Sequence, residues 1–174
     1  TTTLEEDEEY RTYVDWRGIT MKNRQDGNTL PNYIANPVVD SGDWKRYRSD
    51  HLGHDTKGRT VGIGNFASTS GSIDAPIQIG SYPFGCFGTP RDVLGVEHLL
   101  ISYYDAPEMV QEIVDTYVDM WLDVYTAVAA HVQIDHVHIW EDMSGKQGSL
   151  ISMEMVERFM MPSYDRIAEF CVEH

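Results

Sequence analysis

The chain has 174 residues, enough to bury a hydrophobic core as one domain or as part of a larger one. Its formal net charge of −15 argues against nucleic acid or an anionic membrane as the main partner, because binding to phosphates needs clustered cations. Two distant cysteines, and no apolar run of the roughly 18 to 20 residues that cross a bilayer, favour a cytoplasmic protein without a disulfide scaffold.

The first 50 residues read as a hairpin followed by a short helix. Residues 10–14 and 19–21 alternate apolar and polar side chains on either side of the turn-like sequence Asp-Trp-Arg-Gly at 15–18. Ser41 precedes a segment with helical spacing and can cap a short helix there. We expect this region to be compact and to lie at the periphery of the fold.

The segment from 51 to 80 is rich in Gly, Ser and Thr. Its sequence GIGNFA at 62–67 loosely matches the glycine fingerprint of nucleotide-binding loops, but no strand pattern precedes it and no helical pattern follows. We therefore expect a flexible loop rather than a nucleotide site. Residues 76–80 predict a short strand, followed by a glycine-bearing loop and by a helix that Thr89 can cap.

A long helix is the clearest predicted element. Asp105 stands three residues before Glu108, which is the spacing of a capping box, and Pro107 suits the first turn. The apolar residues that follow recur with helical period, so we interpret their stripe as core. The stripe consists of Val110, Ile113, Val114, Tyr117, Trp121, Val124 and Val128.

After the long helix the pattern predicts a strand over 132–140, an acidic loop, and a helix that begins at Ser152. Pro162 should kink or divide this last helix. Strands and helices that alternate through short connections are typical of βα units, so we expect residues 51–174 to contribute to a parallel sheet.

Two adjacent acids, Glu141 and Asp142, follow the predicted strand. In α/β folds the carboxyl ends of strands are where active sites are built. If burial raises the pKa of one acid, that acid becomes a candidate proton donor, while loop amides hold the other. The alternative is that these acids cap the turn at 144–145 or pair with Lys146.

Arg91 opens the helix after the glycine-bearing loop and is a second candidate for chemistry. Its guanidinium could bind a substrate carboxylate through two parallel hydrogen bonds. It could equally pair with Asp92 or Glu97, and the sequence leaves the two interpretations open.

His136 and His138 share one face of the predicted strand with Trp140. Two imidazoles at this spacing can reach one metal ion, yet no third ligand can be identified from spacing. The alternative is that neighbouring backbone groups or a covering helix satisfy both rings. We therefore predict no metal site within this chain.

At these residues the chain resembles the uroporphyrinogen decarboxylase superfamily, which also contains corrinoid-dependent methyltransferases and uncharacterised barrels. The resemblance covers most of the chain, and it rests on the order and spacing of five motifs. They are PVV at 37–39 with DWK at 43–45, FGCFGTPRDVLG at 84–95, YDAPEMV at 104–110, IWEDM at 139–143 with GSLIS at 148–152, and FMMPSY at 159–164.

The resemblance implies a (β/α)8 TIM-type barrel with its pocket at the carboxyl ends of the strands. The chain begins without Met and ends in a helical pattern without a cap, so we expect a central fragment of that barrel, with the hairpin region before it. The decarboxylases hold a tetrapyrrole without metal or cofactor. The methyltransferases use a zinc ion, bound by a His-x-Cys pair and a later Cys, and take a methyl group from a corrinoid.

This chain departs from both patterns. Its acidic loop reads Glu-Asp-Met rather than the Glu-Ser-His kind of the decarboxylases, and a hairpin stands where their Arg- and Gln-bearing loop would be. These departures favour cobalamin-dependent methyl transfer over decarboxylation of uroporphyrinogen in porphyrin biosynthesis. Neither Cys86 nor Cys171 sits where the family would place a zinc ligand.

The expected site joins the two acids as catalytic residues to a set of side chains that contact substrate. The catalytic pair is Glu141 and Asp142, and the substrate contacts are Phe84, Phe87, Arg91, Trp140 and His138. No cofactor is expected within the chain itself, while a complete methyltransferase parent would use zinc and a corrinoid. The expected partners are a tetrapyrrole or methyl-donor substrate and a corrinoid protein. The alternative is an inactive partial barrel or an interaction module, which would leave sheet edges uncovered and associate.

Overall fold

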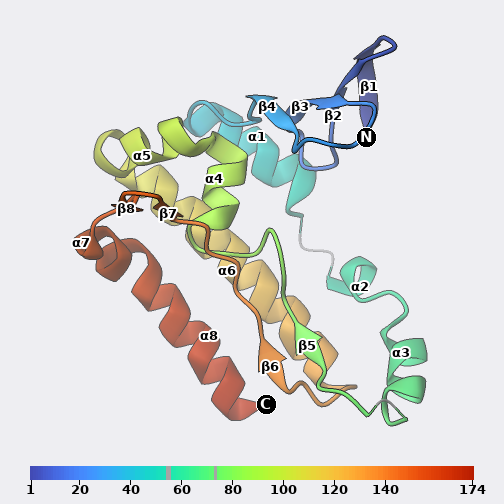
Figure 1. Ribbon diagram of the computed structural model, residues 1–174. Helices are drawn as coiled ribbons and strands as arrows, with labels where there is room; N and C mark the ends of the chain where they lie inside the picture. The colour runs from blue at the N-terminus through green and yellow to red at the C-terminus, as the bar shows by residue number, and fades with distance from the viewer. Residues whose placement is uncertain (54–55, 73) are drawn as a thin grey trace.

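The N-terminal region of the computed structural model, which describes residues 1–53, 56–72 and 74–174, is a four-stranded antiparallel sheet (Figure 1). Its strands, in spatial order, are β1 (Thr2–Glu6), β2 (Tyr10–Val14), β3 (Thr20–Arg24) and β4 (Asn32–Ala35). The predicted hairpin is confirmed, because Tyr10 pairs with Arg24 and Val14 with Thr20. Asp15 closes its turn by accepting hydrogen bonds from the backbone N–H groups of Arg17 and Ile19.

Helix α1 (Ser41–His51) begins one residue earlier than the sequence suggested. Asp40, not Ser41, is the N-cap: its Oδ1 accepts from the backbone N of Gly42 at 2.7 Å and of Asp43 at 2.8 Å. A cap residue needs an extended backbone, and Asp40 has it, whereas Ser41 is already helical. The helix packs against α6 and buries Trp44.

Residues 62–67, which we expected to form a flexible loop, instead begin the helix α3 (Ile63–Ser70), so that prediction is wrong. A shorter helix, α2 (Thr56–Arg59), precedes it. Gly62, at φ 89°, turns the chain into α3, and Ser68 and Thr69 donate their hydroxyls to the carbonyl of Asn65. Local hydrogen bonds therefore support a helix that buries none of its own residues.

The predicted parallel pairing is confirmed between two short strands that lie side by side (Figure 1), but the strand expected over 132–140 is limited to two residues. β5 (Gln78–Ile79) pairs with β6 (His136–Val137), and the extended backbone continues with a 2.8 Å bond from the His138 N to the Ile79 O. Trp140 N also donates to Phe84 O at 2.7 Å. The fold is thus mixed α/β, and a barrel stays a prediction.

Three helices connect β5 to β6: α4 (Gly88–Leu94), α5 (Val96–Asp105) and α6 (Pro107–Ala129). Two predicted caps are wrong. Thr89 lies inside α4, where its hydroxyl donates to Pro83 O at 2.7 Å and accepts from Gly85 N at 3.1 Å. Asp105 is the last residue of α5, and α6 begins after Ala106 without a side-chain cap.

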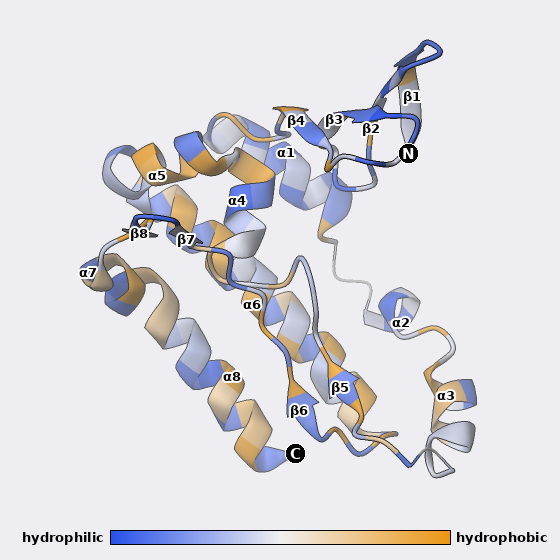
Figure 2. Cartoon of the chain, in the orientation of Figure 1, coloured by the Kyte–Doolittle hydropathy of each residue, from blue (hydrophilic) through white to orange (hydrophobic). Residues whose placement is uncertain are grey.

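The stripe on α6 forms the centre of the core, as predicted. Five of its seven residues are buried, and Val124 and Val128 are half-buried. They pack against α5, α8 and α1, and Figure 2 shows the alternation of hydrophobic and hydrophilic bands along α6. The largest fully buried side chains of the described residues include Trp44, Phe87 and Phe159.

The chain ends in a small hairpin and a divided helix. Its elements are β7 (Ser144–Gly145), β8 (Gly148–Ser149), α7 (Met153–Met155), the π-helical turn η1 (Val156–Met160) and α8 (Met161–Glu173). The Ser152 side chain caps the first of these helices, as predicted. The division before Pro162 is also confirmed, because the π turn gives way to α8 at that point. No helix in the described part of the chain is long and apolar enough to span a membrane.

Candidate active site

Glu141 is bound into the loop that follows β5. Its Oε1 accepts from Cys86 N at 2.5 Å and from the Tyr164 hydroxyl at 2.7 Å. Its Oε2 accepts from Phe87 N at 2.9 Å and from Gly88 N at 3.1 Å. A carboxylate offers about four acceptor positions, so these donors occupy all of them. Glu141 is therefore the acid that the loop amides hold, and it joins β6 to the start of α4 and to α8.

Two glycines allow this loop to approach the end of β6 closely. A Cβ atom built at Gly85 would lie 2.8 Å from the Glu141 carboxylate and would collide with the Trp140 carbonyl. A Cβ at Gly88 would lie 2.6 Å from the same carbonyl oxygen. The glycine-bearing loop is thus required for close contact between backbones, and the contact brings its amides to Glu141.

Asp142 forms an ion pair with Arg91. The Arg91 Nη1 lies 2.7 Å from Asp142 Oδ2 and also donates to the Asp142 carbonyl at 3.0 Å. Asp92, the alternative partner, lies 3.8 Å away at the edge of ion-pair range. The Asp142 side chain is 59% exposed, whereas Arg91 is 19% exposed. Both residues line a cavity of about 750 Å³ between α4, α5 and β4.

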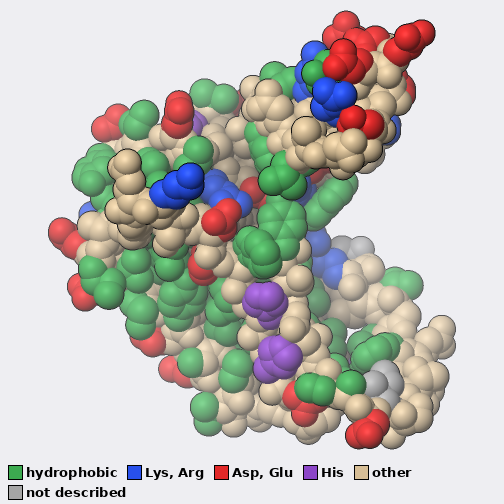
Figure 3. All heavy atoms as spheres, viewed as in Figure 1, with side chains coloured by type: hydrophobic (Ala, Val, Ile, Leu, Met, Phe, Trp, Pro, Cys, Tyr) green, Lys and Arg blue, Asp and Glu red, His purple; other side chains and the backbone are tan. Residues whose placement is uncertain are grey.

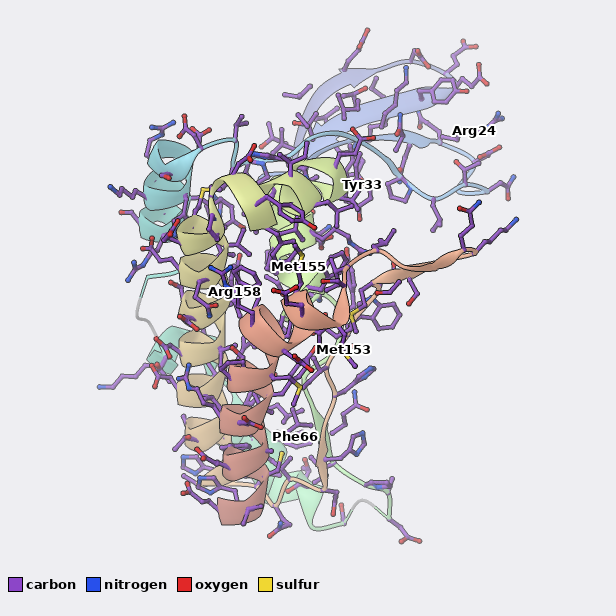
Figure 4. The ribbon with its side chains drawn as sticks, turned by 90° about the vertical axis from the view of Figure 1, so that its left-hand side faces the viewer. Arg24, Tyr33, Phe66, Met153, Met155 and Arg158 are labelled. Carbon is purple, nitrogen blue, oxygen red and sulfur yellow. The ribbon has the colours of Figure 1, made fainter. Side chains whose placement is uncertain are left out.

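A second polar network, which sequence reasoning missed, ties the N-terminal hairpin to α4. Arg17 forms an ion pair with buried Asp92 and donates to the Tyr82 hydroxyl at 2.6 Å. The Tyr82 hydroxyl in turn donates to Asp92 at 2.9 Å and lies 3.3 Å from that of Tyr33, which projects from β4 (Figure 4). Arg17 also pairs with Asp15 at 2.7 Å. Because 75 residues separate Arg17 from Asp92, no local spacing indicates this contact.

Burial sets the ionisation of this network. Desolvation raises the pKa of Asp92, although the nearby Arg17 charge opposes the shift. Burial also raises the pKa of Tyr82, which stays a neutral hydrogen-bond donor. Asp92 is thus a buried acid of α4 whose pKa is raised by burial.

The structure separates the five predicted substrate contacts. Trp140, 41% exposed, packs edge-on against Tyr82 with ring centroids 5.8 Å apart, and His138 lies beside it. Figure 3 shows imidazoles and apolar side chains together on this open face over β6. Phe84 instead packs on Trp121, and Phe87 is fully buried in the core rather than facing a pocket.

His136 of β6 and His138, just after it, both approach one side chain of β5. His136 Nε2 lies 2.7 Å from Gln78 Oε1, and His138 Nδ1 lies 3.3 Å from Gln78 Nε2. Across residues 1–53, 56–72 and 74–174, no three His, Cys, Asp or Glu side chains form a group that could hold a metal. Cys86 is buried, and desolvation raises the pKa of its thiol. These residues do not fit a zinc site of the methyltransferase kind.

No protein-family model, curated protein or solved structure matches this chain.

Proposed function

We propose that this chain carries part of the ligand site of a uroporphyrinogen decarboxylase-superfamily enzyme that acts on a tetrapyrrole or corrinoid-linked substrate. One observation carries the proposal: in the segments that follow the parallel strands β5 and β6, Glu141 accepts from the amides of residues 86–88, and its neighbour Asp142 pairs with Arg91. Ligands of α/β proteins bind outside the carboxyl ends of the strands. The 750 Å³ cavity beside Arg91 is within the usual size range of small-molecule sites.

The two acids take different parts in this proposal. Glu141 has no acceptor position left, so it positions the loop rather than handling a proton. Asp142 is exposed, and among the described residues its side chain is bound to Arg91 alone. A substrate carboxylate can replace it on the guanidinium, because both groups offer the same planar pair of oxygens. Arg91 then binds the substrate, and Asp142 is free to accept a proton or a hydrogen bond.

The proposed reaction is methyl transfer in preference to decarboxylation. The support is the Glu-Asp-Met loop after Trp140 and the hairpin at the N-terminus, both of which differ from the decarboxylase pattern. Arg91 suits either reaction, because propionates of a tetrapyrrole and of a corrinoid both need cations. We assign no reaction step to zinc, since the described residues do not form its ligand set.

Ligand binding tests the proposal directly. We expect hydroxocobalamin or uroporphyrin to quench tryptophan fluorescence saturably, because Trp140 is exposed at the strand ends. Arg91→Gln should weaken binding by about tenfold or more, the usual effect of losing a hydrogen bond to a charged group. Lys146→Gln, in the β7–β8 turn, removes the same charge and should leave binding unchanged.

Turnover then separates the reactions. Demethylation of methylcobalamin by a thiol supports methyl transfer, and release of CO2 from uroporphyrinogen supports decarboxylation. Asp142→Asn should lower the rate of the supported reaction. If neither tetrapyrrole binds, or if Arg91→Gln and Lys146→Gln behave alike, the proposed site is wrong.

A further inference from the structure

A second cavity, of about 450 Å³, lies on the other side of Asp92 from the Arg91–Asp142 cavity. It is bounded by the end of α1, by α2, by the carboxyl end of β5 and by the second half of α6. Figure 3 shows a recess between the main body and the segment that carries α2 and α3. The two cavities share Asp92 as a common wall, and they differ in the chemistry of their linings.

The wall of this cavity is aromatic. It includes Tyr47, Phe84, Tyr117, Trp121 and Tyr125. Trp121 is 4% exposed, and its indole Nε1 finds no hydrogen-bond partner among the residues that the structure describes. A flat apolar ring packs well against such a wall, because aromatic pairs attract beyond the area that they bury.

Charge gives the cavity two different ends. At one end Arg17 is balanced by Asp15 and Asp92. At the other end Arg59 uses one of its five N–H donors on the His51 carbonyl, at 3.0 Å, and among the described residues it forms no ion pair. An anionic group is therefore favoured at the Arg59 end and repelled by the carboxylates at the other.

We propose that this cavity binds a flat aromatic carboxylate, with its ring against Trp121 and Phe84 and its carboxylate at Arg59. The site is separate from the one proposed for the tetrapyrrole, because it uses neither Arg91 nor Asp142. A volume of about 450 Å³ admits a two-ring compound and not a complete tetrapyrrole.

Calorimetric titration with naphthalene-2-carboxylate, and with neutral 2-naphthylmethanol as its matched probe, tests the proposal. In the wild-type chain the carboxylate should bind about fivefold more tightly than the alcohol, as expected for an exposed ion pair. Arg59→Gln should remove that preference and leave the alcohol unchanged. Arg48→Gln, on the outer side of α1, is the control, because Arg48 pairs with Glu112 and does not line the cavity.

A cavity-filling variant locates the ring. Val124→Phe places a larger side chain in the cavity wall and should weaken both probes by about tenfold or more. Thr126→Phe adds the same side chain at an exposed position of the same helix and should change neither affinity. Circular dichroism melting checks that both variants fold.

The proposed site is wrong if neither probe binds, or if the acid and the alcohol bind equally to the wild-type chain. It is also wrong if Val124→Phe and Thr126→Phe have the same effect on affinity. Loss of tetrapyrrole binding in Arg91→Gln would not affect these measurements, so the two proposals fail independently.

Discussion

The N-terminal sheet and the parallel strand pair are stabilised in different ways. In the sheet, neighbouring strands are joined by short turns, all residues of β1 and β4 are exposed, and the buried side chains are Ile19 and Met21. In the pair, Gln78 and His136 are 58 residues apart and are brought together by α4, α5 and α6. Short turns between neighbouring strands thus set the register of the N-terminal sheet. The parallel pair and the residues that follow it depend instead on the packing of the helical core.

The two regions meet at one buried contact. Arg17, in the hairpin turn, pairs with Asp92 in α4, and a Cβ atom built at Gly18 would lie 3.3 Å from Pro37 and 3.9 Å from the ring of Tyr47. The N-terminal hairpin and helix α4 therefore each supply part of the polar network beside the candidate site. Substitutions on either side of this contact can show how far the two regions depend on each other.

The largest expected difference in the free energy of unfolding is between a substitution in the helical core and one in the N-terminal sheet. Phe87→Ala should lower the free energy of unfolding by about 3–5 kcal/mol, because a fully buried ring leaves a cavity. Ile34→Ala, in β4, removes an exposed side chain and should change it by less than about 0.5 kcal/mol. Urea denaturation measures both, and similar losses would contradict the assignment of the core to the helical region.

The Glu141 contacts should give the next largest effect. Glu141→Gln places an amide N–H group against backbone donors and should cost about 1–3 kcal/mol. Tyr164→Phe removes one of the four bonds and should cost about 1 kcal/mol. Glu154→Gln, an exposed acid in α7, is the control. Equal stability of all three variants in the same denaturation assay would show that Glu141 does not hold the loop.

A smaller effect is expected where α1 begins, just after the sheet. Asp40→Ala should cost about 1 kcal/mol, because two backbone N–H groups at the start of the helix lose their acceptor. Ser41→Ala should be nearly neutral, since its hydroxyl does not cap the helix. Thermal melting compares the two, and the reverse order would restore Ser41 as the cap.

The smallest expected effect is a change in the pH dependence of stability at the contact between the regions. Burial raises the pKa of Asp92 above its ordinary value of 3.8. The folded state then holds the proton more tightly, so this group's contribution to stability is complete below the unfolded pKa and is lost as the pH rises through the raised value.

Asp92→Asn should therefore lose stability relative to the wild-type chain as the pH falls from about 7 to about 4. Asp40 provides the opposite case, because backbone hydrogen bonds from Asp43 and Gly42 lower its pKa, and its contribution is lost as the pH falls. Denaturant titrations at a series of pH values distinguish the two. Parallel profiles for Asp92→Asn and the wild-type chain would contradict the raised pKa.

Patterns within one element could be read correctly from the sequence. The hairpin around residues 15–18, the buried stripe of α6, the Ser152 cap and the division at Pro162 are all set by neighbours in the chain. The errors arose where two local choices compete. Asp40 and Ser41 are both good caps. Residues 62–67 have weak helical periodicity and no hydroxyl side chains, but the hydroxyls of Ser68 and Thr69, further along α3, bond to the Asn65 carbonyl.

By itself the sequence determined the helical period of the apolar stripe on α6, the turn of the N-terminal hairpin and the acidic pair that follows β6. Each of these features depends on residues only a few positions apart. Only the tertiary structure decided which acid is held by amides, which one pairs with Arg91, and that Asp92 is buried against Arg17. Those outcomes depend on long-range packing and on desolvation, and neither is encoded in local spacing. For the same reason the sequence could identify the residues that follow the strands as site candidates. It could not assign the different contacts that each of them makes.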